Sequence, residues 1–123
     1  MTMPRILVAE DNAVNRELVR EILQGEGFEV VEACDGEEAL RLIGEEHPDL
    51  VILDIQMPRM DGYSLLRAIR NAPKLSGTPT LALTAYAMQG DKARALDAGF
   101  DAYVSKPFES AKLLAEVNRL LAR

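Results

Sequence analysis

The chain has 123 residues, the usual size of one domain, and its 48% hydrophobic and 28% charged content is that of an ordinary globular protein. Its 20 acidic residues outnumber its 14 basic ones, and the net charge of -6 argues against nucleic acid or an anionic membrane as the main partner. No apolar run approaches the ~18 residues of a membrane span, residues 1–5 lack the apolar core of a signal peptide, and the single Cys34 can form no internal disulfide, so we expect a cytoplasmic protein.

The first strand and the first helix are predicted from hydrophobic periodicity. Residues 6–9 form a compact apolar run that stops at Glu10 and Asp11, and Asn12 stands where a helix N-cap would lie. Apolar residues then recur at spacings of three and four, which predicts an amphipathic helix whose apolar stripe consists of Val14, Leu18, Val19, Ile22 and Leu23.

The same alternation continues to the end of the chain. Further strands are predicted at residues 28–33, 50–53, 81–83 and 102–104, and a helical pattern follows each of them. The helix at residues 89–98 has few large apolar residues, so we expect it to pack lightly. Five strands alternating with five helices predict parallel βαβ units and an α/β three-layer sandwich, with helices on both faces of the sheet.

Polar residues follow four of the five predicted strands. Because the carboxyl ends of parallel strands lie at one edge of the sheet, these scattered residues converge in space: Glu10, Asp11, Asp54, Thr84 and Lys106. Three carboxylates at that edge repel one another by ~3 kcal/mol per pair at about 5 Å. One lysine cannot offset this repulsion, so the pattern predicts a hard divalent cation, and an all-oxygen site suits Mg²⁺.

Asp54 differs from the other two acids, because it ends the most apolar strand and is expected to be held most rigidly. A carboxylate beside Mg²⁺ can act as a nucleophile and accept a phosphoryl group. Thr84 and Lys106 would supply a hydroxyl donor and a fixed cation for the phosphoryl oxygens. Each acid alone is better explained as a solvated loop residue, but their joint placement at the strand ends favours a site.

These five residues, with Pro107 after Lys106, resemble the receiver domain of bacterial two-component response regulators. The loop at residues 57–62 is also similar to that family's loop after the phosphorylated aspartate, and the resemblance covers essentially the whole chain. It implies a single receiver domain over residues 1–123, with a flavodoxin-like sheet in the order 2-1-3-4-5. It also implies a signalling protein rather than an enzyme, which takes a phosphoryl group onto Asp54 from a histidine kinase or a histidine phosphotransfer protein.

The resemblance implies a ligand set for the metal. Asp11 and Asp54 would bind Mg²⁺ directly, with Mn²⁺ as the alternative ion, and Glu10 would bind largely through water. The backbone carbonyl of Gln56 would complete the shell. Lys106 would pair with the phosphoryl group.

The resemblance also implies a switch. The Lys106–Pro107 peptide bond would be cis. Thr84 would move to hydrogen-bond the phosphoryl group and Tyr103 would turn inward behind it, which would reshape the surface of the fourth helix, fifth strand and fifth helix.

Two further positions tune the phosphoryl lifetime in that family, and here they are Gln56 and Tyr86. A ring at Tyr86 would obstruct the approach of water, which predicts slow self-dephosphorylation. The alternative is that Tyr86 simply packs on the neighbouring helix.

Three other interpretations use the same residues. A haloacid-dehalogenase-type phosphatase carries a second acid two residues after its nucleophile, and a topoisomerase-primase-type domain needs Asp-x-Asp, but Gln56 stands at that position. A degenerate receiver that only binds partners is the third, and the presence of every phosphorylation residue argues against it.

The output is left open by the sequence. Only the last predicted helix follows Pro107, so we expect a downstream protein to bind the receiver's own surface, or the phosphoryl group to be relayed onward, unless the chain is excised from a larger protein. Segments 9–16 and 84–88 look most like receivers of hybrid kinases and stand-alone relay regulators. We expect a monomer or weak dimer, and the sequence identifies neither the kinase nor the target.

Overall fold

Five parallel strands form one sheet in the computed structural model, which describes residues 3–84 and 90–122. The strands are β1 (Arg5–Ala9), β2 (Glu29–Ala33), β3 (Leu50–Asp54), β4 (Thr80–Thr84) and β5 (Ala102–Ser105). Their order, β2-β1-β3-β4-β5, is the one expected for a flavodoxin-like sheet. Every residue of β3 and β4 is buried, which explains why these two segments read as continuous apolar runs.

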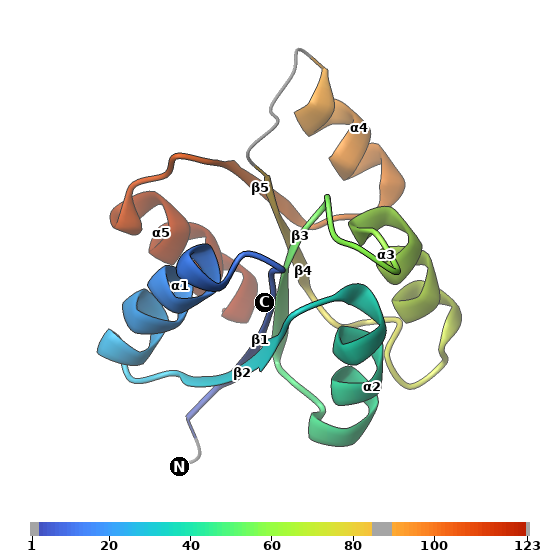
Figure 1. The fold of residues 1–123 in the computed structure, drawn as a ribbon, viewed down its shortest axis with the longest axis horizontal. Helices are drawn as coiled ribbons and strands as arrows, with labels where there is room; N and C mark the ends of the chain where they lie inside the picture. The colour runs from blue at the N-terminus through green and yellow to red at the C-terminus, as the bar shows by residue number, and fades with distance from the viewer. Residues whose placement is uncertain (1–2, 85–89, 123) are drawn as a thin grey trace.

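Helices cover both faces of this sheet. They are α1 (Ala13–Gly25), α2 (Gly36–Glu46), α3 (Gly62–Asn71), α4 (Asp91–Ala98) and α5 (Ser110–Leu121). Helices α1 and α5 lie on one side, and α2, α3 and α4 lie on the other (Figure 1). The buried side chains accordingly form two clusters, one on each face of the sheet, so the predicted three-layer α/β sandwich is confirmed.

Side-chain caps fix the start of three of these helices. The side chains of Asn12, Asp35 and Asp61 each accept a hydrogen bond from the backbone N–H three residues later, at 3.0, 2.8 and 2.8 Å. Such a cap stabilises a helix by ~1 kcal/mol. Because Asn12 and Asp61 lie in the loops that follow β1 and β3, these caps also order two loops at the carboxyl edge of the sheet.

The predicted strand boundaries differ from the observed ones by one residue at several ends, and two differences in boundaries have a local explanation. The second strand begins at Glu29 rather than at Phe28, because the backbone N–H of Phe28 donates to Leu23 and closes the last turn of α1. The helix predicted from residue 89 is observed from Asp91, where Gly90 precedes it with a φ of 90°; residue 89 lies outside the described part.

The apolar stripe predicted for α1 is only partly buried. Val19 and Leu23 are buried in the core, whereas Val14 and Leu18 expose 75% and 48% of their surface. An α-helix turns by about 100° per residue, so Val14 and Leu23 lie on opposite sides of it. The stripe is therefore too wide for one sheet to cover, and its outer half is left at the surface.

Within the described residues, no helix is both long and apolar enough to cross a membrane.

Candidate functional site

The sheet topology places the five predicted site residues at one edge. Ala9 of β1 pairs with Leu53 of β3, so Glu10, which follows β1, and Asp54, the last residue of β3, lie next to each other. Thr84 ends β4 and pairs with Ser105 of β5, which immediately precedes Lys106. The residues that converge there are Glu10, Asp11, Asp54, Thr84 and Lys106.

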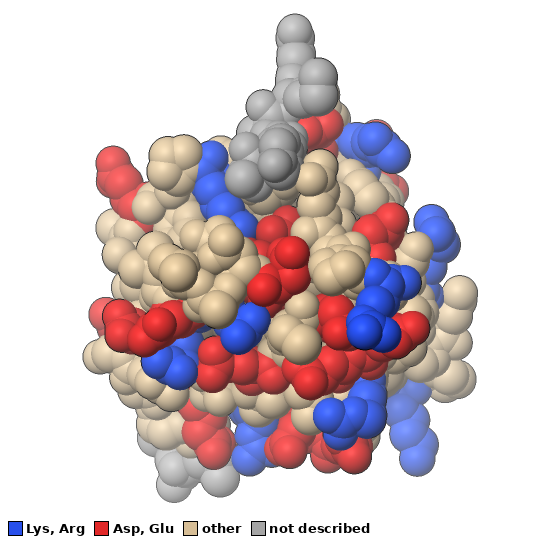
Figure 2. Space-filling model, viewed as in Figure 1, with Lys and Arg blue, Asp and Glu red and all other residues tan. Residues whose placement is uncertain are grey.

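Three carboxylates form the centre of this site. One oxygen from each of Glu10, Asp11 and Asp54 lies within 4.8 Å of the other two. Glu10 and Asp54 are buried, with 1% and 8% of their surfaces exposed, whereas Asp11 is exposed. Acidic side chains gather in the middle of the face seen in Figure 2. We call this cluster of three carboxylates, two of them buried and one exposed to solvent, the acidic pocket.

Lys106 reaches into the acidic pocket from the segment after β5. Its ammonium group donates to Oε1 of Glu10 and, at 3.1 Å, to Oδ2 of Asp54. Only 11% of the Lys106 side chain is exposed, so this cation is held in place rather than free in solvent. One ammonium group thus bridges the two buried carboxylates.

The charges of the acidic pocket are only partly balanced by this lysine. Burial raises the pKa of the Glu10 carboxyl to about 7; the hydrogen bond from Lys106 lowers it, and the neighbouring Asp54 raises it. Burial by itself would lower the pKa of Lys106, but its bonds to Glu10 and Asp54 outweigh burial and raise it. The lysine therefore stays charged, and the pocket still carries excess negative charge.

Backbone contacts hold the Asp54 carboxylate from the other side. The N–H of Gln56 donates to Oδ1 of Asp54 at 2.9 Å, while Oδ2 receives the bond from Lys106. The loop after β3 closes where the N–H of Gly62 donates to the carbonyl of Ile55 at 2.8 Å. A Cβ on Gly62 would lie 2.7 Å from Cα of Ile55, so the start of α3 can approach the strand end only as glycine.

Of the predicted switch residues, Thr84 lies next to the acidic pocket at the end of β4, and Tyr103 lies on the neighbouring strand β5. Thr84 is buried with 3% of its surface exposed, and the peptide bond from Lys106 to Pro107 is cis, the isomer that the resemblance implies. Tyr103 is half-buried against the core cluster under α3 and α4, and burial raises the pKa of its hydroxyl. Within the described part of the chain, that buried hydroxyl has no hydrogen-bond partner. Tyr86 lies outside the described residues.

Two features of the site were not found from the sequence. Nη1 of Arg16 donates to the carbonyl of Glu10 at 2.8 Å and so ties α1 to the pocket loop. The exposed side chains of Val14 and Leu18 lie on α1, the helix that begins immediately after the acidic pocket. An arginine in an amphipathic helix is normally exposed to solvent, so its bond to Glu10 was not predictable. Periodicity alone places the whole apolar stripe in the core, so the exposure of Val14 and Leu18 was not predictable either.

The donor set fits a hard divalent cation. Three carboxylates offer oxygen ligands at mutual distances that one ion can span, and Asp11 leaves one side open for water or substrate oxygens. Mg²⁺ prefers this combination of a few protein oxygens with an otherwise open shell. An ion there would also compensate the charge that Lys106 leaves unbalanced.

The chain is similar to proteins of one signalling family. A family model described as the response regulator receiver domain matches residues 6–118. The polar-differentiation response regulator DivK of Brucella ovis is 34% identical over 116 residues, which cover 94% of each chain.

Solved structures of the same kind superpose closely on this fold. The chemotaxis response regulator CheY4 of Vibrio cholerae has a TM-score of 0.89 and 33% identity, covering 97% of this chain and 99% of that one. The receiver domain of a sensor histidine kinase from Pseudomonas aeruginosa PAO1, described with a magnesium ion coordinated in its active site cleft, has a TM-score of 0.91 and 35% identity, covering 99% of this chain and 100% of that one.

Proposed function

Because this chain belongs to the response regulator receiver family, we propose that Asp54 accepts a phosphoryl group from a phosphohistidine on a histidine kinase or a phosphotransfer protein. The observation that carries the proposal is the environment of the Asp54 carboxylate. It is bonded by Lys106 at 3.1 Å and by the N–H of Gln56 at 2.9 Å, and it shares the acidic pocket with two further carboxylates. A carboxylate so oriented is prepared for in-line attack.

The transfer is a displacement at phosphorus. One oxygen of the Asp54 carboxylate forms the new O–P bond while the P–N bond to the donor imidazole breaks, and the imidazole leaves with the electron pair of that bond. The N–H of Gln56 and the ammonium of Lys106 keep the carboxylate from rotating. Proximity and orientation therefore supply much of the acceleration that this chain contributes.

The metal ion belongs to the same proposal. Glu10, Asp11 and Asp54 would hold Mg²⁺, or Mn²⁺ in its place, with the backbone carbonyl of Gln56 as a further ligand. When bound, the ion neutralises charge on the carboxylates and on the oxygens of the incoming phosphoryl group.

Lys106 and Thr84 would stabilise the phosphorylated form. Lys106 now pairs with Asp54, and after transfer its ammonium would bind a phosphoryl oxygen instead. Thr84 ends β4 beside Asp54 and would donate its hydroxyl to another phosphoryl oxygen. Tyr103 would follow on the same side of the sheet, so that the surface of α4, β5 and α5 changes for a downstream protein or for onward relay.

The phosphoryl donor would dock on the outer face of α1. Val14 and Leu18 expose apolar surface on the helix that begins beside the acidic pocket, where a partner delivering a phosphohistidine must approach. We expect Leu18→Ser to slow phosphotransfer from a phosphohistidine protein about tenfold and to leave phosphorylation by a small donor unchanged. Equal slowing with both donors would contradict docking on α1.

The lifetime of the phosphorylated form would be set at Gln56 and Tyr86. The side chain of Gln56 is exposed at the mouth of the acidic pocket, where it can meet an attacking water. We expect self-dephosphorylation to be slow, and Tyr86→Ala to accelerate it, measured as the decay of phosphorylated protein; an unchanged rate would remove Tyr86 from this role.

We expect the protein to act in the cytoplasm as a monomer or weak dimer.

The experiment that tests the proposed function is phosphorylation with a small acyl phosphate in the presence of Mg²⁺, followed by mass spectrometry. Wild-type protein should gain one phosphoryl group and Asp54→Asn none. Asp97→Asn, at an exposed position on α4, is the matched control and should behave as wild type. Phosphorylation that persists in Asp54→Asn, or is absent from wild type, would overturn the proposal.

A further inference from the structure

Helix α4 is attached to the rest of the molecule more weakly than the other helices. Of its eight residues, all of them described, only Ala95 is buried, whereas α3 buries four. Gly90 precedes it without a side-chain cap; α5 also begins without one, whereas α1, α2 and α3 have capped starts. Few buried contacts and an uncapped start are the marks of an element that opens locally at low cost.

The two ends of α4 are not held equally. After its C-terminal end, Phe100 is buried with 3% of its surface exposed, and the backbone N–H of Asp101 donates to the carbonyl of Thr80 at 2.9 Å. The carboxylate of Asp101 in turn accepts from the backbone N–H of Thr80 at 2.8 Å. This reciprocal pair fixes the turn between α4 and β5 to the start of β4.

Arg70, at the end of α3, strengthens that attachment. Its Nη2 donates to the carbonyl of Gly99 and to the carboxylate of Asp101, both at 3.0 Å. Its Nη1 donates to the carbonyls of Ser76 and Thr78 in the loop before β4. One partly buried guanidinium group thus joins the end of α3, the start of β4 and the end of α4.

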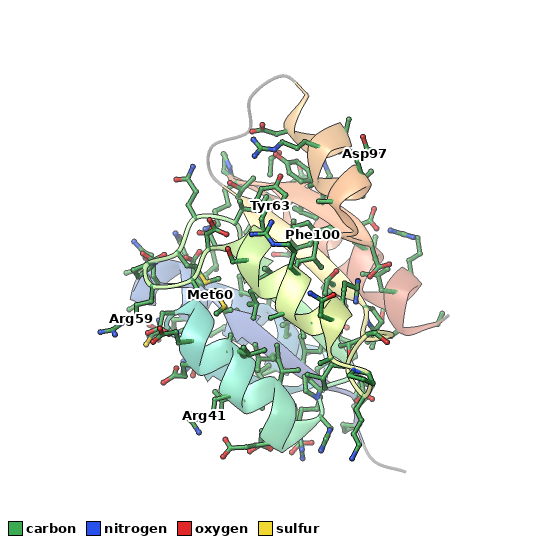
Figure 3. The ribbon with its side chains drawn as sticks, turned by 90° about the vertical axis from the view of Figure 1, so that its right-hand side faces the viewer. Arg41, Arg59, Met60, Tyr63, Asp97 and Phe100 are labelled. Carbon is green, nitrogen blue, oxygen red and sulfur yellow. The ribbon has the colours of Figure 1, made fainter. Side chains whose placement is uncertain are left out.

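Further toward the start of α4, a different contact reaches α3. The guanidinium of Arg94 lies over the ring of Tyr63, 5.0 Å from its centroid, in a cation–π arrangement. The Tyr63 ring also meets Phe100 edge to face, with centroids 5.8 Å apart. Figure 3 shows Tyr63 of α3 and Phe100 side by side beneath α4. Arg94 itself is exposed, so this contact is weak enough to break and reform.

We propose that α4 unwinds away from α3 while residues 99–101 stay fixed as its hinge, and that the Arg94–Tyr63 contact is the latch that holds its N-terminal half closed. A helix of eight residues is not stable by itself, so α4 loses its internal hydrogen bonds when it leaves α3. The hinge residues keep their bonds to Arg70 and Thr80 during this opening. The motion belongs to the unphosphorylated protein; only its use in signalling rests on the proposed function.

Amide hydrogen exchange in the unphosphorylated chain tests the latch directly. An exposed cation–π contact corresponds to about a two- to five-fold change in an equilibrium. We therefore expect Arg94→Gln to speed exchange at residues 94–98 about two- to five-fold, while the amide of Asp101 keeps its wild-type rate. Arg94→Lys, which keeps a cation, should restore part of the protection. Tyr63→Phe, which keeps the ring, should retain most of it.

Two controls separate a latch from a general loss of stability. Arg41→Gln, an exposed arginine of α2 paired with Glu45, makes the same change of helix propensity and should leave exchange in α4 unchanged. In a Tyr63→Leu background, Arg94→Gln should have no further effect, because its partner ring is gone.

Arg94→Gln without effect on α4, or with the same effect in both backgrounds, would overturn the latch, and equal acceleration at Asp101 would overturn the hinge. None of these readouts requires phosphorylation, so they fail independently of the proposed function.

Discussion

The end of β3 and helix α4 are held in opposite ways. Every residue of β3 is buried and the carboxylate of Asp54 receives hydrogen bonds on both oxygens. Helix α4 buries Ala95 and reaches α3 through an exposed arginine. A phosphoacceptor needs fixed geometry, whereas an element that reports on it must move at low cost. The difference in burial is the one expected if, as proposed, Asp54 carries the chemistry and α4 carries the response.

The largest expected effect on the unfolding free energy appears when one apolar side chain is truncated in β3 and one in α4. Ile52→Ala in β3 removes a side chain with no exposed surface and should cost ~2–5 kcal/mol of unfolding free energy, because it leaves a cavity. Leu96→Ala in α4 removes a side chain that is already 40% exposed and should cost less than ~1 kcal/mol. Urea denaturation of both variants measures this difference, and equal losses would break the comparison.

Substitution of two glycines by alanine compares the end of β3 with the exposed surface of a helix. A Cβ on Gly62 would meet Cα of Ile55 at 2.7 Å and the carbonyl oxygen of Asp54 at 3.0 Å. Gly62→Ala should therefore cost ~1–3 kcal/mol and slow phosphorylation of Asp54 as the strand end shifts. Nothing lies within 4 Å of a Cβ on Gly44 of α2, so Gly44→Ala should stabilise by up to ~1 kcal/mol.

Urea denaturation and the rate of phosphorylation by a small donor test both glycine variants. A Gly62→Ala protein as stable and as reactive as wild type would show that the loop is not held against β3.

Mg²⁺ should bind at the strand-end region and thereby stabilise the whole folded chain. Mg²⁺ at ten times its dissociation constant raises the unfolding free energy by about 1.4 kcal/mol if it binds only the folded chain. Asp11 is exposed, so Asp11→Asn should fold normally and lose most of this gain. Thermal unfolding with and without Mg²⁺ measures it, with Asp97→Asn as the control that keeps the gain. An undiminished gain in Asp11→Asn would remove this carboxylate from the ligand set.

The sequence was sufficient to predict an element or a site wherever the local pattern of residues follows from the position of that segment in the sheet. The run at residues 50–53 is apolar because both faces of β3 are covered, and its position before Asp54 follows from the alternation of strands and helices. Once the strands are parallel, Asp54, Thr84 and Lys106 must meet at one edge, so the acidic pocket was predictable before any distance was known.

Side-chain contacts between two elements could not be predicted from periodicity and strand order. Arg94 and Tyr63 are separated along the chain and carry no shared motif, so only the packing of α4 on α3 brings them together. The exposure of Val14 and Leu18 depends on how much of α1 the sheet can cover, which periodicity does not specify. Helix propensity and spacing describe each element alone, and the latch arises where two elements meet.

The smallest expected effect is that of removing the hydroxyl of Tyr103 on β5. Its hydroxyl is buried and, among the residues that the structure describes, has no hydrogen-bond partner. Burying such a group costs ~1–3 kcal/mol, and Tyr103→Phe keeps the ring while removing the cost, so the variant should be more stable by ~0.5–1 kcal/mol after small packing losses. Burial also raises the pKa of this phenol, so the folded state favours its protonated form.

The contribution of the protonated phenol to the unfolding free energy is fully present below its unfolded pKa near 10. It is lost as the pH rises through the higher folded pKa. Wild type should therefore lose stability above pH ~10 more steeply than Tyr103→Phe, which lacks the titrating group. Urea denaturation at neutral and alkaline pH measures both effects. A Tyr103→Phe protein less stable than wild type would mean that the hydroxyl makes a hydrogen bond in the folded state, and that Tyr103 is fixed rather than free to turn.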